Sequence, residues 1–277
     1  MRKDGRGRDH KMSEIRVAIA GAKGRMGREA VKMVMNEPLF TFVRGIDRVL
    51  NGDDVGEVIG IGSIGVTFSN SIEDVLFGDR PDVLVDLTEP TAAKRHVRLA
   101  LEAGVRPVVG TSGWTKEDIA QLDELSQERK VGGVIAPNFA IGAVLMMQFA
   151  KEAAKYLPHV EIVEMHHDQK LDAPSGTAVK TAELIAESRP ELKQGHPEET
   201  ELLEGARGAY TDGFRLHSVR LPGLVAHQQV LFGGPGQTLT IRHDSINRES
   251  FMPGINLAVK KVMHLDRLVY GLEHLLD

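Results

Sequence analysis

The chain has 277 residues, enough for two domains that each bury a core of their own. With 42% hydrophobic and 26% charged residues, it falls outside the ranges of disordered, collagen-like and membrane-embedded proteins. A formal net charge of -5 provides no broad positive field, so we expect no nucleic-acid partner, and the lack of cysteine excludes disulfides and cysteine metal sites. We therefore expect small-molecule chemistry in a reducing compartment, the cytoplasm.

Residues 1–12 are charged and glycine-containing, without the apolar segment of a signal peptide. We interpret them as a flexible N-terminal extension, because the first strand pattern starts only at Ile15. No uninterrupted apolar run approaches the ~20 residues that a membrane-spanning helix requires, so no membrane partner is expected.

From Ile15 to about Asn138, short apolar runs alternate with amphipathic stretches, a pattern typical of βαβ units around a parallel sheet. Strands are expected at residues 16–20, 41–47, 83–87, 106–109 and 131–136, and helices at 25–35, 91–103 and 116–129. Gly104 fits a helix C-terminus and Thr115 a helix N-cap. The pattern predicts a first domain built on five parallel strands.

After Phe139 the pattern changes to that of a second, β-rich domain. Helices are expected at 142–156 and 177–187 and strands at 160–165, 214–220, 225–232 and 239–243, the last three antiparallel. A glycine-proline segment at 233–236 predicts a hairpin connection. Helical patterns at 253–264 and from there to Leu276 close the chain, and their apolar faces are expected to cover the first domain's sheet.

The loop after the first expected strand has the spacing G-x-x-G-x-x-G up to Gly27 and contains Gly21, Ala22, Lys23, Gly24, Arg25 and Met26. Glycines there permit a tight turn, close approach of a pyrophosphate and close packing of the following helix. The spacing departs from the usual G-x-G-x-x-G, and a glycine-rich turn in any α/β sheet is the alternative reading.

Asp47 closes the second expected strand, where an acidic side chain would bind an adenosine ribose. Arg48, together with Lys23 and Arg25, could equally hold a 2′-phosphate, so the cofactor is NADH or NADPH, with the choice left open. Further turns at strand ends are candidate cofactor contacts or ordinary turn chemistry. They contain Thr88, Gly110, Thr111, Ser112, Ala136, Pro137, Asn138 and Phe139.

Proton donors gather after the strand expected at 160–165. His166, His167 and Lys170 precede Ser175, Gly176 and Thr177, which open a helix. A helix N-terminus with free amides suits a substrate carboxylate, and histidine and lysine suit proton transfer. Alternatively, the histidines are ordinary structural residues and Ser175 is only a cap. No metal site is expected, because no zinc-type spacing exists.

The stretch from residue 161 to 178, with its His-His, Lys170 and Ser-Gly-Thr elements, resembles the 4-hydroxy-tetrahydrodipicolinate reductase (dihydrodipicolinate reductase) family, as do the cofactor turns in order. The resemblance covers 15–276. It implies that His166 and Lys170 are the catalytic residues, and which of the two delivers the proton is left open. The implied substrate contacts are His167, Ser175, Gly176 and Thr177. Lys23 and Ser112 depart from residues common in relatives, glycine and threonine.

The resemblance implies an α/β fold, with an N-terminal Rossmann-like parallel-sheet domain and a second α+β domain with a mixed or antiparallel sheet. Residues 13–138 plus 248–277 would bind the dinucleotide, and 139–247 would bind substrate and oligomerise. The implied partners are a cyclic dicarboxylate imine and three copies of the chain in a homotetramer. Candidate interface residues are Val219, Leu224, Val230 and Phe232.

The residues by themselves leave two alternative functions open. One is a two-domain reductase acting on an aspartate-derived semialdehyde, which would share the nucleotide domain. The other is a nicotinamide-sensing regulator without chemistry. Arg242, His243 and Arg248 either add positive charge around the substrate or are simply solvated strand-edge residues.

Overall fold

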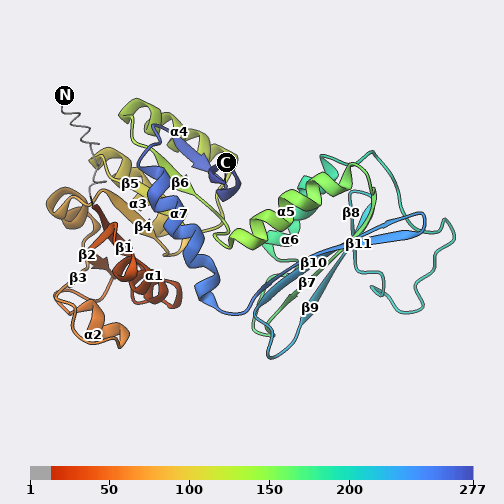
Figure 1. Cartoon of the computed structure of the whole chain (residues 1–277), viewed down its shortest axis with the longest axis horizontal. Coiled ribbons are helices and arrows are strands. Elements are labelled where there is room, and N and C mark those ends of the chain that lie inside the picture. Colours follow the sequence, from red (N-terminus) through yellow and green to blue (C-terminus); the bar gives the residue numbers. More distant parts are fainter. Residues whose placement is uncertain (1–13, 277) are drawn as a thin grey trace, which may run out of the picture. The chain divides into compact units, whose positions relative to one another are not determined.

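The computed structural model describes residues 14–276, so the expected flexible extension at 1–12 lies outside the described residues. The described chain divides into two compact units (Figure 1). The first contains residues up to 137 together with 258–270, and the second contains 138–257 together with 271–276. The division runs through helix α7 (Met252–Val262), whereas the sequence assigns all of 248–277 to the dinucleotide domain.

The first unit is built on a seven-stranded sheet in which every neighbouring pair is parallel. The strand order is β12-β6-β5-β4-β1-β2-β3. The bounds are β1 (Ile15–Ala20), β2 (Phe40–Ile46), β3 (Phe68–Ser69), β4 (Val83–Asp86), β5 (Arg106–Val109), β6 (Gly133–Ile135) and β12 (Leu268–Tyr270). All four residues of β4 are buried, as expected for a central strand of a parallel sheet that is covered on both faces.

The five expected strands of this sheet are confirmed, and two edge strands were not expected. β3 has two residues, too short to show periodicity. The segment after His264 was expected to be helical to Leu276, and this prediction is wrong. Leu268, Val269 and Tyr270 instead pair with β6, which suits their apolar and aromatic side chains, and a 3-10 helix (Leu272–Leu275) follows.

The helices of the first unit are α1 (Arg25–Asn36), α2 (Val55–Ile59), α3 (Pro90–Ala103) and α4 (Lys116–Arg129), with a π-helical turn at Asp74–Asp79. The three expected helices are confirmed. α4 begins at a reciprocal cap between Thr115 and Asp118, and α3 ends at Gly104 with φ 77°. α2 and the π-helical turn were not expected.

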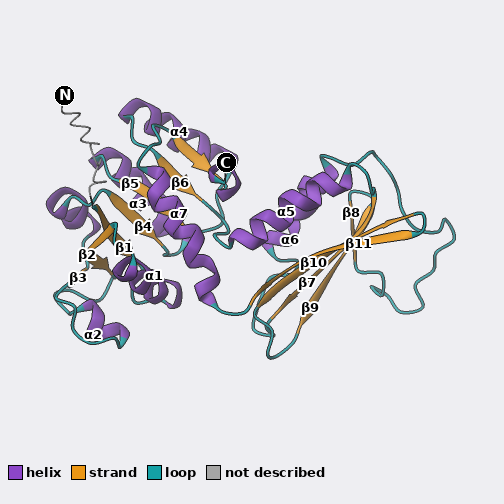
Figure 2. Cartoon of the chain, viewed as in Figure 1, coloured by secondary structure: helices purple, strands orange, loops and turns teal. Residues whose placement is uncertain are grey.

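The second unit packs two helices on one face of a five-stranded sheet (Figure 2). The helices are α5 (Ile141–Ala154) and α6 (Gly176–Ala186), and the strands are β7 (His159–His166), β8 (Ala209–Thr211), β9 (Phe214–Arg220), β10 (Ala226–Gly234) and β11 (Gln237–Ser245). The order is β11-β10-β7-β9-β8, and the sheet is mixed because β7 and β9 run parallel. β10 and β11 join through Pro235 and Gly236 (φ 71°), which confirms the hairpin.

Alternation along the strands separates a covered face from an open face of this sheet. Val160, Ile162, Val230 and Phe232 are at most 2% exposed and form one core with α5 and α6. The expectation that Val230 and Phe232 belong to an exposed interface is therefore wrong. Successive side chains of a strand point to opposite faces of the sheet, so the residues adjacent in sequence to these buried ones lie on the open face. Its apolar members are Val163, Met165, Tyr210, Val219 and Leu231.

Candidate functional site

The glycine-rich loop between β1 and α1 has a backbone that side chains would disrupt. Gly21 has φ 78°, and its carbonyl accepts a hydrogen bond from the Gly24 N–H at 2.9 Å. A Cβ on Gly27 would lie 2.1 Å from the Gly21 oxygen, so the helix packs on the loop only with glycine there. α1 has no side-chain cap, which leaves its first N–H groups for another acceptor. The loop therefore has the form of an anion-binding cradle.

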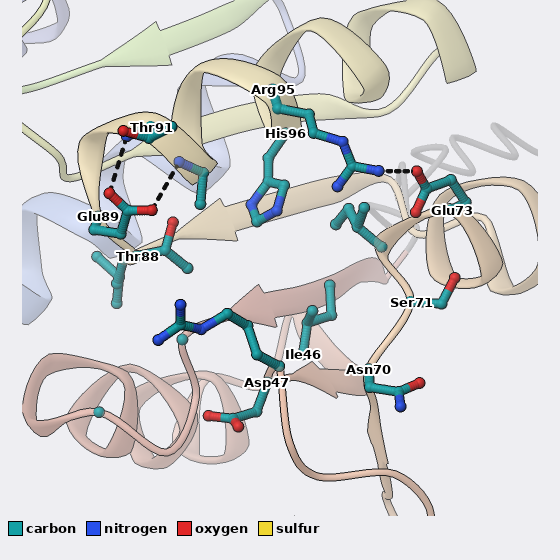
Figure 3. A pocket seen from close by; sticks show the side chains of 16 residues that line it. Ile46, Asp47, Asn70, Ser71, Glu73, Thr88, Glu89, Thr91, Arg95 and His96 are labelled. Carbon is teal, nitrogen blue, oxygen red and sulfur yellow. Dashed lines mark hydrogen bonds and ion pairs between the residues drawn. The ribbon is translucent and has the colours of Figure 1, made fainter.

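A cavity of about 680 Å³ opens beside this loop, at the carboxyl ends of β1 to β4 (Figure 3). Open α/β sheets bind ligands at this edge. The predicted cofactor residues that line it are Gly21, Gly24, Asp47, Arg48 and Thr88. Asp47 accepts a hydrogen bond from the Val49 N–H at 3.1 Å through Oδ1. The cavity thus brings the glycine loop, the acidic strand end and a cationic side chain to one place.

Asp86 and His96 support this cavity and were not anticipated from sequence. Asp86, at the end of β4, is fully buried, and its Oδ2 lies 2.7 Å from His96 Nδ1. Its Oδ1 accepts from the N–H and the hydroxyl of Thr88 at 2.9 and 2.6 Å. The carboxylate thus fixes the turn that carries Thr88 and the ring that lines the cavity from α3.

The rest of the cavity wall was also missed. Asn70 and Ser71 follow β3, a strand too short to be recognised from its pattern. Glu73 and Arg95 form an ion pair across the opening, as Figure 3 shows. In the sequence, Glu73 stands next to Asp74 and Arg95 next to Lys94, which is typical of an ordinary solvated surface.

The remaining predicted cofactor turns lie at other strand ends. Gly110, Thr111 and Ser112 follow β5, and the Thr111 hydroxyl donates to the Thr88 carbonyl at 3.1 Å. Ala136 and Pro137 follow β6. Asn138 and Phe139 belong to the second unit, where the Asn138 amide donates to the Thr177 hydroxyl at 3.1 Å.

In the second unit, β7 ends at His166, and its ring is held by a buried carboxylate. Glu164 lies two residues earlier on the same strand face, and its Oε2 is 2.6 Å from His166 Nδ1. The Glu164 side chain is fully buried, and Arg220 of β9 binds it with two nitrogens at 2.8 and 3.0 Å. Burial favours the neutral acid, but the hydrogen bonds from His166, Arg220 and Ser218 outweigh it and lower the pKa of Glu164 to about 2.

Lys170 and Asp172 form an ion pair in the loop that follows β7. The Lys170 ammonium is 2.7 and 2.8 Å from the two oxygens of the Asp172 carboxylate. These hydrogen bonds lower the pKa of Asp172 below its ordinary value. The backbone carbonyl of Asp172 accepts from Arg220 Nη2 at 2.8 Å. Arg220 thus contacts both the carboxylate that holds His166 and the backbone of Asp172, whose side chain holds Lys170.

The N-terminus of α6 completes this cluster. Ser175 is the N-cap: its hydroxyl accepts from the Ala178 N–H at 3.2 Å, and its own N–H donates to Glu164 at 3.3 Å. The N–H groups of Gly176 and Thr177 find no acceptor within residues 14–276. Gly176 is exposed, with no atom within 4 Å of the position of a Cβ. Two free amides therefore lie at the N-terminus of α6, next to the Ser175 N–H that binds the same carboxylate as His166.

The other candidate residues of this unit make fewer contacts with the cluster around Glu164. The His167 side chain is exposed, and its carbonyl accepts from the Lys170 N–H at 3.2 Å. Arg242 pairs with Asp244, which also binds His227. Burial lowers the pKa of His243, whose ring packs over Gly142 at the start of α5.

Glu164 and Arg220 are the residues of this site that sequence reasoning missed. Glu164 carried a signal, because a residue two positions before a strand-end histidine shares its face. Arg220 gave no such signal, because it lies 56 residues from Glu164 in the sequence and contacts it only in the folded chain. Within residues 14–276, no group of three or more His, Asp or Glu side chains could hold a metal ion, and none of the helices is long and apolar enough to cross a membrane.

Comparisons with known proteins identify the family of the chain. The family model for the N-terminus of dihydrodipicolinate reductase matches residues 15–139, and that for its C-terminus matches 142–276. A 4-hydroxy-tetrahydrodipicolinate reductase of Geobacillus kaustophilus (strain HTA426) is 60% identical, covering 95% of this chain and 99% of its own. That of Bacillus pumilus (strain SAFR-032) is 58% identical over 95% of this chain and 98% of its own.

Similar solved structures point to the same family. The dipicolinate-bound dihydrodipicolinate reductase of Paenisporosarcina sp. TG-14 is 55% identical and superposes with a TM-score of 0.86, covering 95% of this chain and all of its own. An amine dehydrogenase of Mycobacterium smegmatis, 16% identical with a TM-score of 0.67 over 92% of this chain and 94% of its own, shares the fold alone. The chain belongs to the dihydrodipicolinate reductase family.

Proposed function

We propose that the chain reduces 4-hydroxy-tetrahydrodipicolinate, through dihydrodipicolinate, to tetrahydrodipicolinate with NADH or NADPH, in lysine and diaminopimelate biosynthesis. Family membership makes it an oxidoreductase. The observation that carries the assignment of the site is the joining of His166 and Lys170, beside the free amides of α6, in one network of charged hydrogen bonds. Neither a semialdehyde reductase nor a sensor without chemistry requires that arrangement.

The first unit has the features that a dinucleotide requires. The pyrophosphate would lie on the uncapped N-terminus of α1, against the loop of Gly21, Ala22, Lys23, Gly24, Arg25 and Met26. Asp47 would accept from the adenosine ribose, and Arg48 would pair with a 2′-phosphate. Thr88, Gly110, Thr111, Ser112, Ala136, Pro137, Asn138 and Phe139 are the other proposed contacts. The bound cofactor supplies a hydride, which the side chains of this protein do not.

The second unit supplies the proton that must accompany the hydride. Loss of water from the 4-hydroxy substrate creates a conjugated cyclic imine, and hydride addition places negative charge toward its ring nitrogen. His166 and Lys170 are the proposed donors that neutralise this charge. His166 can give a proton from Nε2 because Nδ1 is engaged by Glu164.

The two substrate carboxylates are proposed to bind Lys170, His167 and the start of α6. The amides of Gly176 and Thr177, with the Thr177 hydroxyl, form a neutral anion site that adds to the charge of Lys170. Ser175 positions this site as the N-cap. The Paenisporosarcina relative binds dipicolinate, a planar ring with two carboxylates, and this supports a cyclic dicarboxylate as the ligand.

We further propose a cytoplasmic homotetramer assembled through the open face of the second sheet. The support is the apolar content of that face, where Tyr210 and Leu231 are exposed despite lying in regular strands. The lack of cysteine and the demand for reduced nicotinamide fit the cytoplasm.

Absorbance at the reduced-nicotinamide band tests the function. With freshly generated 4-hydroxy-tetrahydrodipicolinate, the wild-type protein should oxidise NADH or NADPH. The His166→Ala and Lys170→Ala variants should lose about 10²-fold or more in kcat and still bind cofactor. Turnover of a semialdehyde in place of the cyclic dicarboxylate would overturn the proposal, and cofactor binding without any turnover would favour the sensor.

A further inference from the structure

We propose that Glu164 is a positioning residue for the reduction: together with Arg220, it holds the His166 ring in the tautomer that carries hydrogen on Nδ1 and presents Nε2 as the atom that exchanges a proton. This inference rests on the proposed function, which gives His166 its role. It adds a residue that touches neither substrate nor cofactor and acts through the ring it holds.

The strand geometry brings the two side chains together. Residues two apart on a strand point to the same face, so Glu164 lies directly before His166 on the covered side of β7. The Oε2 to Nδ1 distance is 2.6 Å. An ionised carboxylate has no hydrogen to give, so His166 Nδ1 must be the donor in this bond. The hydrogen of the neutral ring is therefore on Nδ1, and Nε2 has a free lone pair.

The carboxylate is kept ionised by the groups around it. Burial opposes the charge, but the hydrogen bonds from His166 and Arg220 hold the pKa of Glu164 at about 2. Arg220 lies beside His166 in the β7–β9 register and binds both Glu164 oxygens. A buried charge without such a partner would cost several kcal/mol, so Glu164 and Arg220 belong together.

The charged groups around the His166 ring come from three strands and a loop. Glu164 contacts it directly, Arg220 lies across the strand pair, and Lys170 with Asp172 lies in the following loop. His243 is on the same sheet face two strands away. Since Asp172 pairs with Lys170, Glu164 is the charged group that holds the ring directly.

The same strand offers a matched control on its opposite face. Glu161 is 2.8 Å from His217 Nε2 and also pairs with Arg207. It therefore forms a second glutamate-histidine-arginine set, made by the same strand but without contact to His166. A Glu161→Gln substitution removes one negative charge from a set with the same residue types, although the Glu161 side chain is 30% exposed and that of Glu164 is fully buried.

Nitrogen-15 spectra of histidine-labelled protein test the inference without turnover. The His166 signals, assigned by their loss in His166→Gln, should show hydrogen on Nδ1 and not on Nε2 in the neutral ring. In Glu164→Ala the ring should change to the Nε2–H tautomer. In Glu164→Gln an acceptor oxygen remains without charge, so the tautomer should persist. Glu161→Gln should alter His217 and leave His166 unchanged.

Kinetics then separate positioning from simple structural support. Glu164→Ala should lower kcat by about tenfold or more with KM little changed, and Glu164→Gln, which keeps the tautomer, should retain more of kcat. An unchanged His166 tautomer in Glu164→Ala would overturn the inference, and so would a changed tautomer with wild-type kcat. Absence of turnover in the wild-type protein would refute the proposed function instead, with the spectra still reporting on the Glu164 contact.

Discussion

Both carboxylate oxygens of Asp172 accept hydrogen bonds from the Lys170 ammonium, at 2.7 and 2.8 Å. A dicarboxylate substrate would have to compete with it for the same cation. Because Asp172 is largely exposed, the ion pair contributes about 1 kcal/mol or less. Asp172→Asn should therefore lower KM by up to about fivefold, with kcat within twofold. Steady-state kinetics measure this, with Asp168→Asn in the same loop as control; a raised KM would show that Asp172 assists binding.

The glycine loop should tolerate no side chain at Gly27. A Cβ would lie 2.1 Å from the Gly21 oxygen, so Gly27→Ala must push α1 from the loop at about 1–3 kcal/mol. We expect a lower melting temperature and a cofactor Kd raised about tenfold or more, measured by NADH fluorescence titration. Gly78→Ala meets no atom within 4 Å and should preserve both values. Wild-type affinity in Gly27→Ala would argue against the cradle.

Asp47 and Arg48 should divide the preference between cofactors. Removing a charged acceptor from a ribose hydroxyl costs about 1.5–3 kcal/mol, so Asp47→Asn should reduce kcat/KM for NADH about tenfold or more. Arg48→Ala should reduce it mainly for NADPH. The ratio of the two kcat/KM values in each variant is the measurement. Asp53→Asn, outside the cavity wall, serves as control, and a ratio that neither variant changes would place the selectivity elsewhere.

Stability should depend on the ionisation of Glu164. Its pKa is lowered from 4.5 to about 2 in the folded chain, so folding favours the ionised form. That contribution is complete above about pH 4.5 and disappears as the pH falls toward 2. Urea unfolding at pH 5 and pH 3 should show a smaller loss of unfolding free energy in Glu164→Gln than in wild type. Glu183→Gln, exposed on α6, should follow the wild type.

The open face of the second sheet should determine the oligomer. Leu231 is exposed in the middle of β10, and Leu231→Arg would place a charge among the apolar residues of that face. We expect dissociation of the tetramer, read as mass by light scattering after size exclusion. Ile61→Arg, an equally exposed position in the first unit, should leave the mass unchanged. A tetramer that persists in Leu231→Arg would place the contacts outside this face.

Patterns within a few residues of sequence predict most of the helices and strands. Helix caps such as Thr115 and glycine ends such as Gly104 mark boundaries through chemistry within a few residues, so sequence predicts them well. β3 and β12 depend on pairing with distant strands, and their short segments carry no periodicity of their own. Val230 and Phe232 were assigned to the wrong face, because alternation shows that a strand has two faces but not which one the helices cover.

The candidate sites divide in the same way. The sequence suggests the residues from His166 to Thr177 as candidates because suitable chemistry and close spacing occur together there. Asp86, His96 and Arg220 were not suggested in this way, because each works through a partner that only the folded chain brings near. Arg220 looks in sequence like any strand-end arginine.

The hydrogen bond from Arg220 to the Asp172 carbonyl has one more consequence. It joins the loop after β7 to a neighbouring strand, so the loop's conformational entropy is lost during folding and not when a ligand arrives. Binding then needs to order the ligand but little of the protein, and more of the contact energy appears as affinity. A substitution at Arg220 should accordingly make binding more enthalpic and entropically less favourable, even though the guanidinium lies outside the proposed carboxylate contacts.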